Sequence, residues 1–311
     1  MSRVPRHPGL HDAKGRQLEH KLLDVGGVRT YTVDAGEGAP ILFIHGYGDT
    51  ADGWRRVVPG LLDTNRVIAI DVPPFGRSER ISDRELFDFY TDYFPALLDA
   101  LEIESATVVG HSLGGAIALR FALANPERVA RLGLIAPAGL GPKPPWWWRP
   151  IAGNGLAWRT ALAIPSPLTP VLIREGISRF LDLRLFHDSR AVRQDIRHLV
   201  ELHSTKTDFG ALLEAGRACI ASYTGTLLEE STAIACPRLL IWGRHDGLVP
   251  VEEGLAFQQS HPDATVHILE RCGHYPQIEM PARFNRLLRA WVAATAAAGD
   301  EPLTPPAAEA A

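Results

Sequence analysis

Ser112 is the residue whose surroundings most plainly suggest chemistry. It lies in the motif G-H-S-L-G at 110–114, after the apolar run 106–109 and before a small-residue helical stretch, 115–124. A serine on a sharp strand-to-helix turn presents its hydroxyl outside the sheet, above a helix N-terminus. The glycines fit this turn because a Cβ there would collide with a neighbouring strand or helix. A plain glycine turn is the alternative, and the flanking strand and helix favour a nucleophile.

A serine hydroxyl is a poor nucleophile at neutral pH, so it needs a base and a carboxylate that orients the base. The apolar run 239–242 leads into Asp246, and the run 266–269 leads into His274. Ligands bind at the carboxyl ends of parallel strands, where the three groups would meet. The sequence therefore predicts Ser112 as nucleophile, His274 as base and Asp246 as the orienting acid.

Other residues compete for these roles. His111 and His245 are each adjacent in sequence to another proposed member and would point away from it. No carboxylate follows the apolar run that ends at Ile135, which favours Asp246 as the acid. Asp71 also ends an apolar run, and we interpret it as a turn-forming aspartate that bonds its own loop.

Acyl transfer places negative charge on an oxygen, which needs preorganised donors. The backbone N–H of Leu113, at the start of the helix, supplies one. The segment His45-Gly46-Tyr47-Gly48 follows the apolar run 41–44, and its glycines let the backbone approach a substrate. The N–H of Tyr47 is the expected second donor, although a plain glycine turn is the alternative.

The rest of the chain alternates strand and helix patterns. Continuous apolar runs are typical of strands buried on both faces, as in a parallel sheet, and they occur at 41–44, 67–70, 106–109, 132–135, 239–242 and 266–269. The pattern at 28–33 predicts an earlier strand, which we expect to lie antiparallel at the edge of the sheet. A capping box at 82–85 opens a helix with an apolar stripe, namely Tyr90, Phe94, Leu97 and Leu101. The fold class is therefore α/β.

The alternation of strand and helix patterns ends after Ile135. Helical patterns without strands follow at 171–186, 191–203 and 209–223. We therefore expect a core at 25–138 and 233–295, a helical insertion at 139–232, an N-terminal extension at 1–24 and a flexible tail at 296–311.

Charge, apolar patterning and cysteine content exclude several classes of function. A net charge of −4 over 311 residues leaves no electrostatic footprint for nucleic acid. No apolar stretch approaches a membrane span, and residues 1–36 do not resemble a signal peptide, so a cytoplasmic protein is expected. Three scattered cysteines imply neither a disulfide framework nor a metal site, and we expect no cofactor. The oligomeric state is not readable.

The chain resembles the α/β-hydrolase superfamily, through His45–Gly48, Asp71–Ser78, Gly110–Gly114, Gly243–Asp246 and Gly273-His274. Pro74 departs from the glycine that this family usually has after Asp-x-Pro. The resemblance implies an α/β-hydrolase fold, a mostly parallel sheet flanked by helices, with the helical insertion as a cap over the site. Epoxide hydrolases and haloalkane dehalogenases use an aspartate nucleophile where Ser112 stands, which argues against them.

Several activities fit these residues. We expect a serine hydrolase that cleaves a carboxylic ester with a sizeable apolar group, a small-molecule substrate, through an acyl-enzyme on Ser112. The alternative is the carbon–carbon hydrolases of ring-fission products, which Cys272–Gln277 resembles, although these usually carry Trp where Tyr275 stands. Such enzymes need a cation for the substrate carboxylate, and a solvated helix face is the plainer interpretation of Arg174, Arg179, Arg190, Arg193 and Arg197.

Further alternatives on the same fold are an acyltransferase and a cofactor-free oxygenase. A binding protein is disfavoured because every triad position is filled. Trp146, Trp147 and Trp148 are expected to line the substrate site and pack the cap, with docking on lipid as the alternative.

Overall fold

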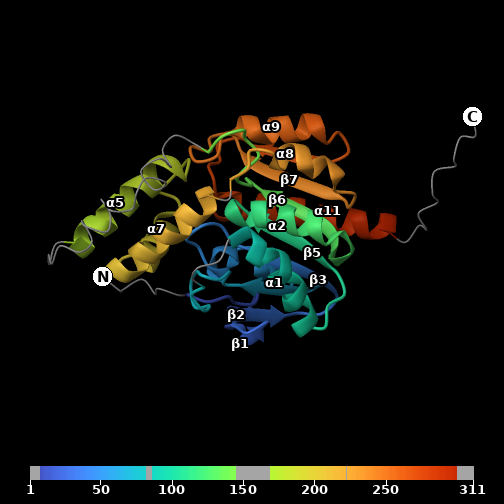
Figure 1. Ribbon diagram of the computed structural model, residues 1–311, viewed down its shortest axis with the longest axis horizontal. Coiled ribbons are helices and arrows are strands. Elements are labelled where there is room, and N and C mark those ends of the chain that lie inside the picture. The colour runs from blue at the N-terminus through green and yellow to red at the C-terminus, as the bar shows by residue number, and fades with distance from the viewer. Residues whose placement is uncertain (1–7, 82–85, 145–168, 222, 300–311) are drawn as a thin grey trace, which may run out of the picture.

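Eight strands form one sheet in the computed structural model, which describes residues 8–81, 86–144, 169–221 and 223–299. The order across the sheet is β1-β2-β4-β3-β5-β6-β7-β8 (Figure 1). Strands β3 to β8 are parallel, and β2 runs antiparallel to both β1 and β4. The strands are β1 His20–Val25, β2 Val28–Ala35, β3 Ala39–Ile44, β4 Asn65–Ile70, β5 Ala106–His111, β6 Val129–Ile135, β7 Arg238–Gly243 and β8 Thr265–Leu269.

The six continuous apolar runs all lie within β3 to β8, so the predicted parallel sheet is confirmed. The predicted strand at 28–33 is β2, which is antiparallel as expected but does not lie at the edge. The edge strand is β1, which sequence reasoning missed inside the expected N-terminal extension. Most of its side chains are exposed, Leu22 included, so its sequence lacks the apolar signal of a buried strand.

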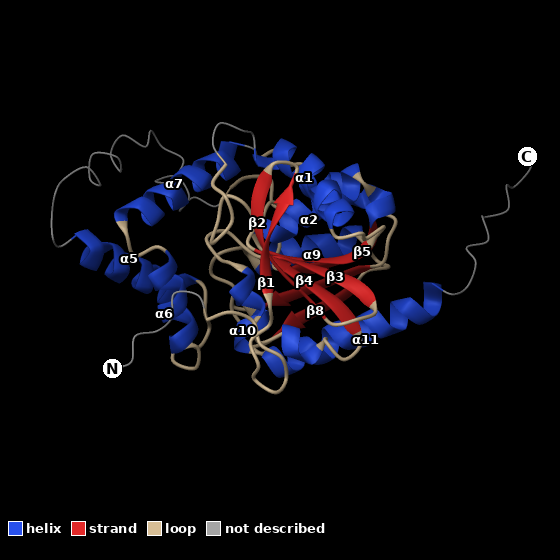
Figure 2. Ribbon diagram, turned by 90° about the horizontal axis from the view of Figure 1, so that it is seen from below, coloured by secondary structure: helices blue, strands red, loops and turns tan. Residues whose placement is uncertain are grey.

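Helices cover both faces of the sheet (Figure 2). Leu42 and Ile44 of β3 pack in the cluster with α1 and α2, whereas Ile41 and Phe43 pack in the cluster with α11. This alternation explains why the central strands are apolar throughout. The helices are α1 Leu86–Ala100, α2 Leu113–Ala124, α5 Thr169–Arg184, α6 Arg193–Leu202, α7 Lys206–Ala221, α8 Leu227–Glu230, α9 Val251–Ser260, α10 Pro276–Glu279 and α11 Pro281–Gly299.

The described helices α5 to α8 lie between β6 and β7 in the chain, where the helical insertion was expected. We refer to 169–230 as the cap helices. Helices α5 and α7 lie beyond one end of the sheet in both views (Figures 1 and 2). Leu181, Leu185 and Phe186 pack with Tyr275 and Ile278 of the core. The exact limits of a cap at 139–232 stay a prediction.

Two expectations concern the residues just before α1 and at the end of α11. The capping box at 82–85 lies outside the described residues, although α1 follows it and buries the predicted stripe that begins at Tyr90. Helix α11 is described as far as Gly299, residues 300–311 lie outside the described residues, and the flexible tail expected at 296–311 stays a prediction.

Candidate active site

Ser112 occupies the turn between β5 and α2, with φ 54° and ψ −117°. A positive φ is uncommon for a residue with a Cβ, and it is typical of a nucleophile on a sharp strand-to-helix turn. The turn is closely packed: a Cβ added to Gly114 would overlap the carbonyl oxygens of Ile44 and His45, and one added to Gly110 would overlap Gly114. The flanking glycines are therefore required by contact with β3 and α2.

Asp246 and His274 meet across the loops that follow β7 and β8. His274 Nδ1 donates to Asp246 Oδ2 at 2.6 Å, and both side chains are buried. Asp246 Oδ1 accepts the backbone N–H groups of Leu248 and Val249 at 2.8 and 2.9 Å. Because Asp246 accepts at Nδ1, the neutral imidazole carries its lone pair on Nε2, which is the atom that a general base needs.

The structure does not join Ser112 to His274 by a hydrogen bond. His274 Nε2 is buried and has no hydrogen-bond partner among the described residues. The two loops are nevertheless neighbours. His111, which precedes Ser112, donates from Nε2 to the His274 carbonyl oxygen at 2.8 Å, and the two rings lie 4.8 Å apart. Catalytic hydrogen bonds are often long without substrate, and His274 as the base for Ser112 stays a prediction.

The competing histidines are accounted for by their surroundings. Burial lowers the pKa of His111 well below its usual value, so the ring is neutral at pH 7. Its bond to the His274 backbone gives it a structural partner. His245 is exposed and stacks on His187, with 4.5 Å between the ring centroids.

The turn 45–48 lies against the nucleophile. A Cβ added to Gly46 would be 3.2 Å from Ser112 Cβ and 3.0 Å from His111 Nδ1. His45 Nε2 accepts the N–H of Val72 at 2.8 Å, so its Nδ1 is the donor to the Gly46 carbonyl oxygen. Burial lowers the pKa of His45, which keeps it in this neutral state. The turn is thus held rigidly beside Ser112.

The two expected oxyanion donors come from the elements that meet here. Leu113 is the first residue of α2, and Tyr47 lies in the turn beside Ser112. The Tyr47 hydroxyl donates to the Leu212 carbonyl oxygen of α7, so its side chain extends toward the cap helices while its backbone stays in the turn. That the N–H groups of Tyr47 and Leu113 bind an oxyanion stays a prediction.

Asp71 behaves as the sequence suggested. Its Oδ2 accepts the backbone N–H of Arg77 at 2.7 Å and its Oδ1 accepts the N–H of Ala51 at 2.8 Å. The Arg77 guanidinium also pairs with the Asp71 carboxylate, which holds the pKa of this buried carboxyl below its usual value. Asp71 therefore anchors the loops after β4 and β3. Within those loops, the peptide bond between Pro73 and Pro74 is cis.

Sequence reasoning missed two carboxyl groups near the site. Asp49 is buried, accepts the N–H of Thr50 at 2.8 Å, and has its pKa raised to about 7 by burial. Glu279 of α10 accepts the N–H groups of Gly273 and His187. Neither belongs to a motif with a distinctive spacing, so only the three-dimensional contacts reveal them.

The expected substrate contacts are not established. Trp146, Trp147 and Trp148 lie outside the described residues. The cap arginines follow the plainer interpretation: all five are exposed, and Arg174 and Arg179 pair with Glu201 and Glu175. In the part of the chain that the structure describes, no group of His, Cys, Asp or Glu side chains is arranged to hold a metal ion, and no helix is long and apolar enough to cross a membrane.

Comparison with known families agrees with this arrangement. The family model described as the alpha/beta hydrolase fold matches residues 39–281. The chain belongs to the α/β-hydrolase family. The match spans the sheet from β3 to the end of α10, including all the predicted catalytic residues.

This α/β-hydrolase is similar to hydrolases of ring-fission products. It is 34% identical to the 2-hydroxymuconate semialdehyde hydrolase of Pseudomonas sp. strain CF600, over 88% of this chain and 93% of that protein. It is 32% identical to the 2-hydroxy-6-oxononadienedioate/2-hydroxy-6-oxononatrienedioate hydrolase of Comamonas testosteroni, over 83% and 89%. The solved meta-cleavage product hydrolase of Pseudomonas fluorescens has a TM-score of 0.74 and 30% identity, over 88% and 97%.

These relatives correct the expected activity. Carboxylic ester hydrolysis, our first expectation, is wrong as the principal interpretation, because the relatives are carbon–carbon bond hydrolases. The alternative activity is the better supported of those considered. The physical reason for the error is that both reactions use the same serine, histidine and carboxylate, and differ in the group that leaves.

Proposed function

We propose that this α/β-hydrolase cleaves a carbon–carbon bond in a conjugated 2-hydroxy-6-oxo-dienoate, adding water across the bond next to the 6-oxo group. The observation that carries the proposal is the 34% identity to a 2-hydroxymuconate semialdehyde hydrolase over nearly the whole of both chains. The reaction needs an activated nucleophile, an oxyanion site and a proton for the leaving carbon. Residues around Ser112 are suited to supply all three.

The first half of the reaction forms an acyl-enzyme. Ser112 Oγ attacks the carbonyl carbon at position 6 while His274 Nε2 takes the hydroxyl proton. The negative oxygen of the tetrahedral intermediate accepts hydrogen bonds from the N–H groups of Tyr47 and Leu113. The bond between carbons 5 and 6 then breaks, and its electron pair moves onto carbon 5. This pair is delocalised onto the carbon-2 oxygen because the substrate reacts in its keto form, which is made before the attack when His274 Nε2 carries the proton of the 2-hydroxyl to carbon 5.

The second half restores the enzyme. The proton on His274 passes to the dienoate fragment, which leaves as 2-hydroxypenta-2,4-dienoate. His274 then takes a proton from water, the hydroxide attacks the ester of Ser112, and a carboxylic acid is released. The bond of 2.6 Å from His274 Nδ1 to the buried Asp246 supports these steps, since it orients the ring and stabilises the imidazolium that forms twice per turnover.

The test uses 2-hydroxymuconate semialdehyde and the purified protein. We expect the dienol absorbance to disappear, with formate and 2-hydroxypenta-2,4-dienoate formed in equal amounts. In water enriched in ¹⁸O, the formate should gain one labelled oxygen. Ser112→Ala should lower kcat by several orders of magnitude while the protein stays folded. A panel with methyl or phenyl in place of the aldehyde hydrogen would then define the acyl group.

Two results would contradict the proposal. One is a wild-type protein that leaves all of these dienoates intact while it turns over a p-nitrophenyl ester. The other is Ser112→Ala with unchanged dienoate turnover, which would remove the nucleophile.

A further inference from the structure

The loop that carries His274 is bonded to the segment just after α5. The backbone N–H of His274 donates to the Leu185 carbonyl oxygen at 2.6 Å. Glu279 bridges the same two segments, since its Oε1 accepts the N–H of Gly273 and its Oε2 accepts the N–H of His187, both at 2.8 Å. One direct hydrogen bond and one bridge through Glu279 therefore join the loop 270–275, here called the base loop, to the segment 185–187, here called the cap stem.

Glu279 is well suited to hold these segments together. Burial raises its pKa, and the backbone N–H groups of His187 and Gly273 oppose that rise by stabilising the carboxylate. Hydrogen bonds to an ionised carboxylate are stronger than those between neutral groups. The base loop and the cap stem are closely packed, because a Cβ added to Gly273 would lie 2.5 Å from the Leu185 oxygen and 2.8 Å from the His187 nitrogen.

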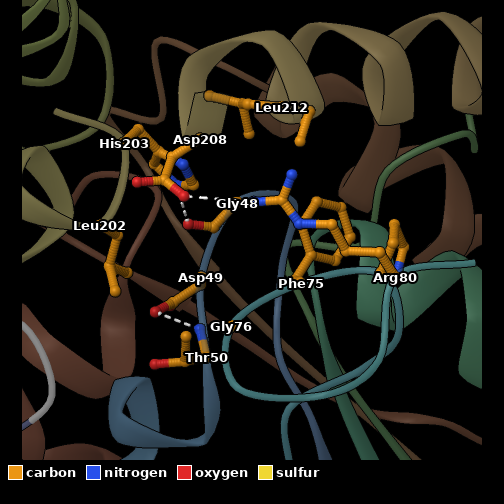
Figure 3. A pocket seen from close by; sticks show the side chains of 12 residues that line it. Gly48, Asp49, Thr50, Phe75, Gly76, Arg80, Leu202, His203, Asp208 and Leu212 are labelled. Carbon is orange, nitrogen blue, oxygen red and sulfur yellow. Dashed lines mark hydrogen bonds and ion pairs between the residues drawn. The ribbon is translucent and has the colours of Figure 1, made fainter. Parts of the chain in front are cut away.

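A second junction links the cap helices to the turn beside Ser112 (Figure 3). His203, at the end of α6, donates from Nε2 to the Gly48 carbonyl oxygen at 2.5 Å. The Tyr47 hydroxyl donates to the Leu212 carbonyl oxygen of α7. Arg80 and Asp208 pair at 3.2 Å across the pocket that these segments line. The cap helices thus contact the turn expected to supply an oxyanion donor.

We propose that Glu279 and His203 are positioning residues. Glu279 holds the base loop against the cap stem, and His203 holds the turn 45–48, here called the oxyanion turn, against the cap helices, so that both segments keep their catalytic geometry. The cap then acts on the catalytic groups themselves as well as on the substrate. The inference depends on the proposed roles of Ser112, His274 and Tyr47, but not on the identity of the substrate. A displacement of about 1 Å at such groups costs roughly 100-fold in rate.

The experiment uses probes too small to need the cap for binding. These are p-nitrophenyl acetate and a methyl fluorophosphonate that labels Ser112. Glu279→Gln keeps one acceptor but turns an NH₂ group toward a backbone N–H. His203→Phe keeps a ring and removes the donor, whereas His203→Gln restores an amide donor. Glu175→Gln on α5 is the matched control, because it breaks an exposed pair with Arg179 far along the cap helix.

We expect Glu279→Gln and His203→Phe to lower kcat/KM for the ester and the labelling rate by roughly 10-fold or more. His203→Gln should recover part of the loss, and Glu175→Gln should match the wild type. On a dienoate the loss should fall on kcat, with KM changed less than about twofold. The far-downfield proton of the His274 Nδ1–H bond should shift in Glu279→Gln and stay in place in His203→Phe.

Unchanged ester hydrolysis and labelling in both variants, with dienoate turnover impaired, would overturn the inference, because the cap residues would then act on substrate alone. If Glu279→Gln does not fold, Glu279→Asp is used instead, since the shorter side chain cannot reach both N–H groups. A wild type that turns over no dienoate would contradict the proposed function and leave this comparison of small probes intact.

Discussion

Asp246→Asn tests the geometry of the candidate base. Asp246 Oδ1 accepts two backbone N–H groups, while Oδ2 accepts one proton from His274. The amide oxygen of Asn will face the two N–H groups, because the opposite orientation sets an NH₂ group against both of them. The NH₂ group then faces His274 Nδ1, which must become an acceptor. The imidazole proton moves to Nε2, and the ring can no longer take the proton of Ser112.

The magnitude follows from the loss of the correct tautomer, which costs roughly 10⁴-fold in kcat in serine hydrolases. At about 1.36 kcal/mol per tenfold, this is about 5 kcal/mol of transition-state stabilisation. Initial rates on a dienoate at neutral pH should show this loss with little change in KM. Asp99→Asn, which alters an exposed pair with Arg128, is the matched control. A kcat within tenfold of wild type for Asp246→Asn would refute the assignment of His274 and Asp246.

Two further predictions concern stability. Gly114→Ala should lower the free energy of unfolding measured in urea by about 1–3 kcal/mol, because the added Cβ overlaps the carbonyl oxygens of Ile44 and His45. Gly176→Ala in α5 has open space around the added Cβ and should raise the free energy of unfolding by about 0.5–1 kcal/mol. Equal effects of the two substitutions would contradict this packing. Because burial raises the pKa of Asp49 from 3.8 to about 7, the native state holds a proton that the unfolded state has lost, and stability falls as pH rises across that window. Asp49→Asn should therefore gain stability relative to wild type between pH 4 and pH 7, by at most about 4 kcal/mol, and a pH-independent difference would argue against a buried, protonated Asp49.

Continuous apolar runs made the parallel sheet predictable, because a strand covered on both faces has no polar side. The exposed edge strand β1 has no such pattern, and only its pairing with β2 identifies it. Asp246 and His274 were predictable as a pair because both follow apolar runs that end on the same rim. A hydrogen bond of 2.6 Å joins the two side chains, and the catalytic roles of Ser112, His274 and Asp246 stay predictions.

Glu279 and His203 could not be predicted in the same way. Each bonds a distant backbone group, since Glu279 and His187 are 92 positions apart and His203 and Gly48 are 155 positions apart. A backbone N–H or carbonyl is common to nearly all residue types, so the sequence does not reveal such a partner. The preference for an ester failed for a related reason. The motifs specify how a serine is activated, whereas the leaving group is selected by the surfaces around it.

The chemistry of the leaving group also explains why the residues that suit ester hydrolysis can catalyse carbon–carbon cleavage, which is the more demanding reaction. An alkoxide that leaves from an ester can be protonated by water, but carbon 5 of a dienol must gain a proton before its bond breaks, since only the keto form can delocalise the electron pair. That demand makes the position of His274 more critical, because its ring carries the proton, and its Nε2 is buried among the described residues. A base loop tied to the cap stem by Glu279 and by the Leu185 carbonyl meets this demand. Carbon–carbon hydrolysis therefore requires firm positioning of a common catalytic set more than it requires new catalytic residues.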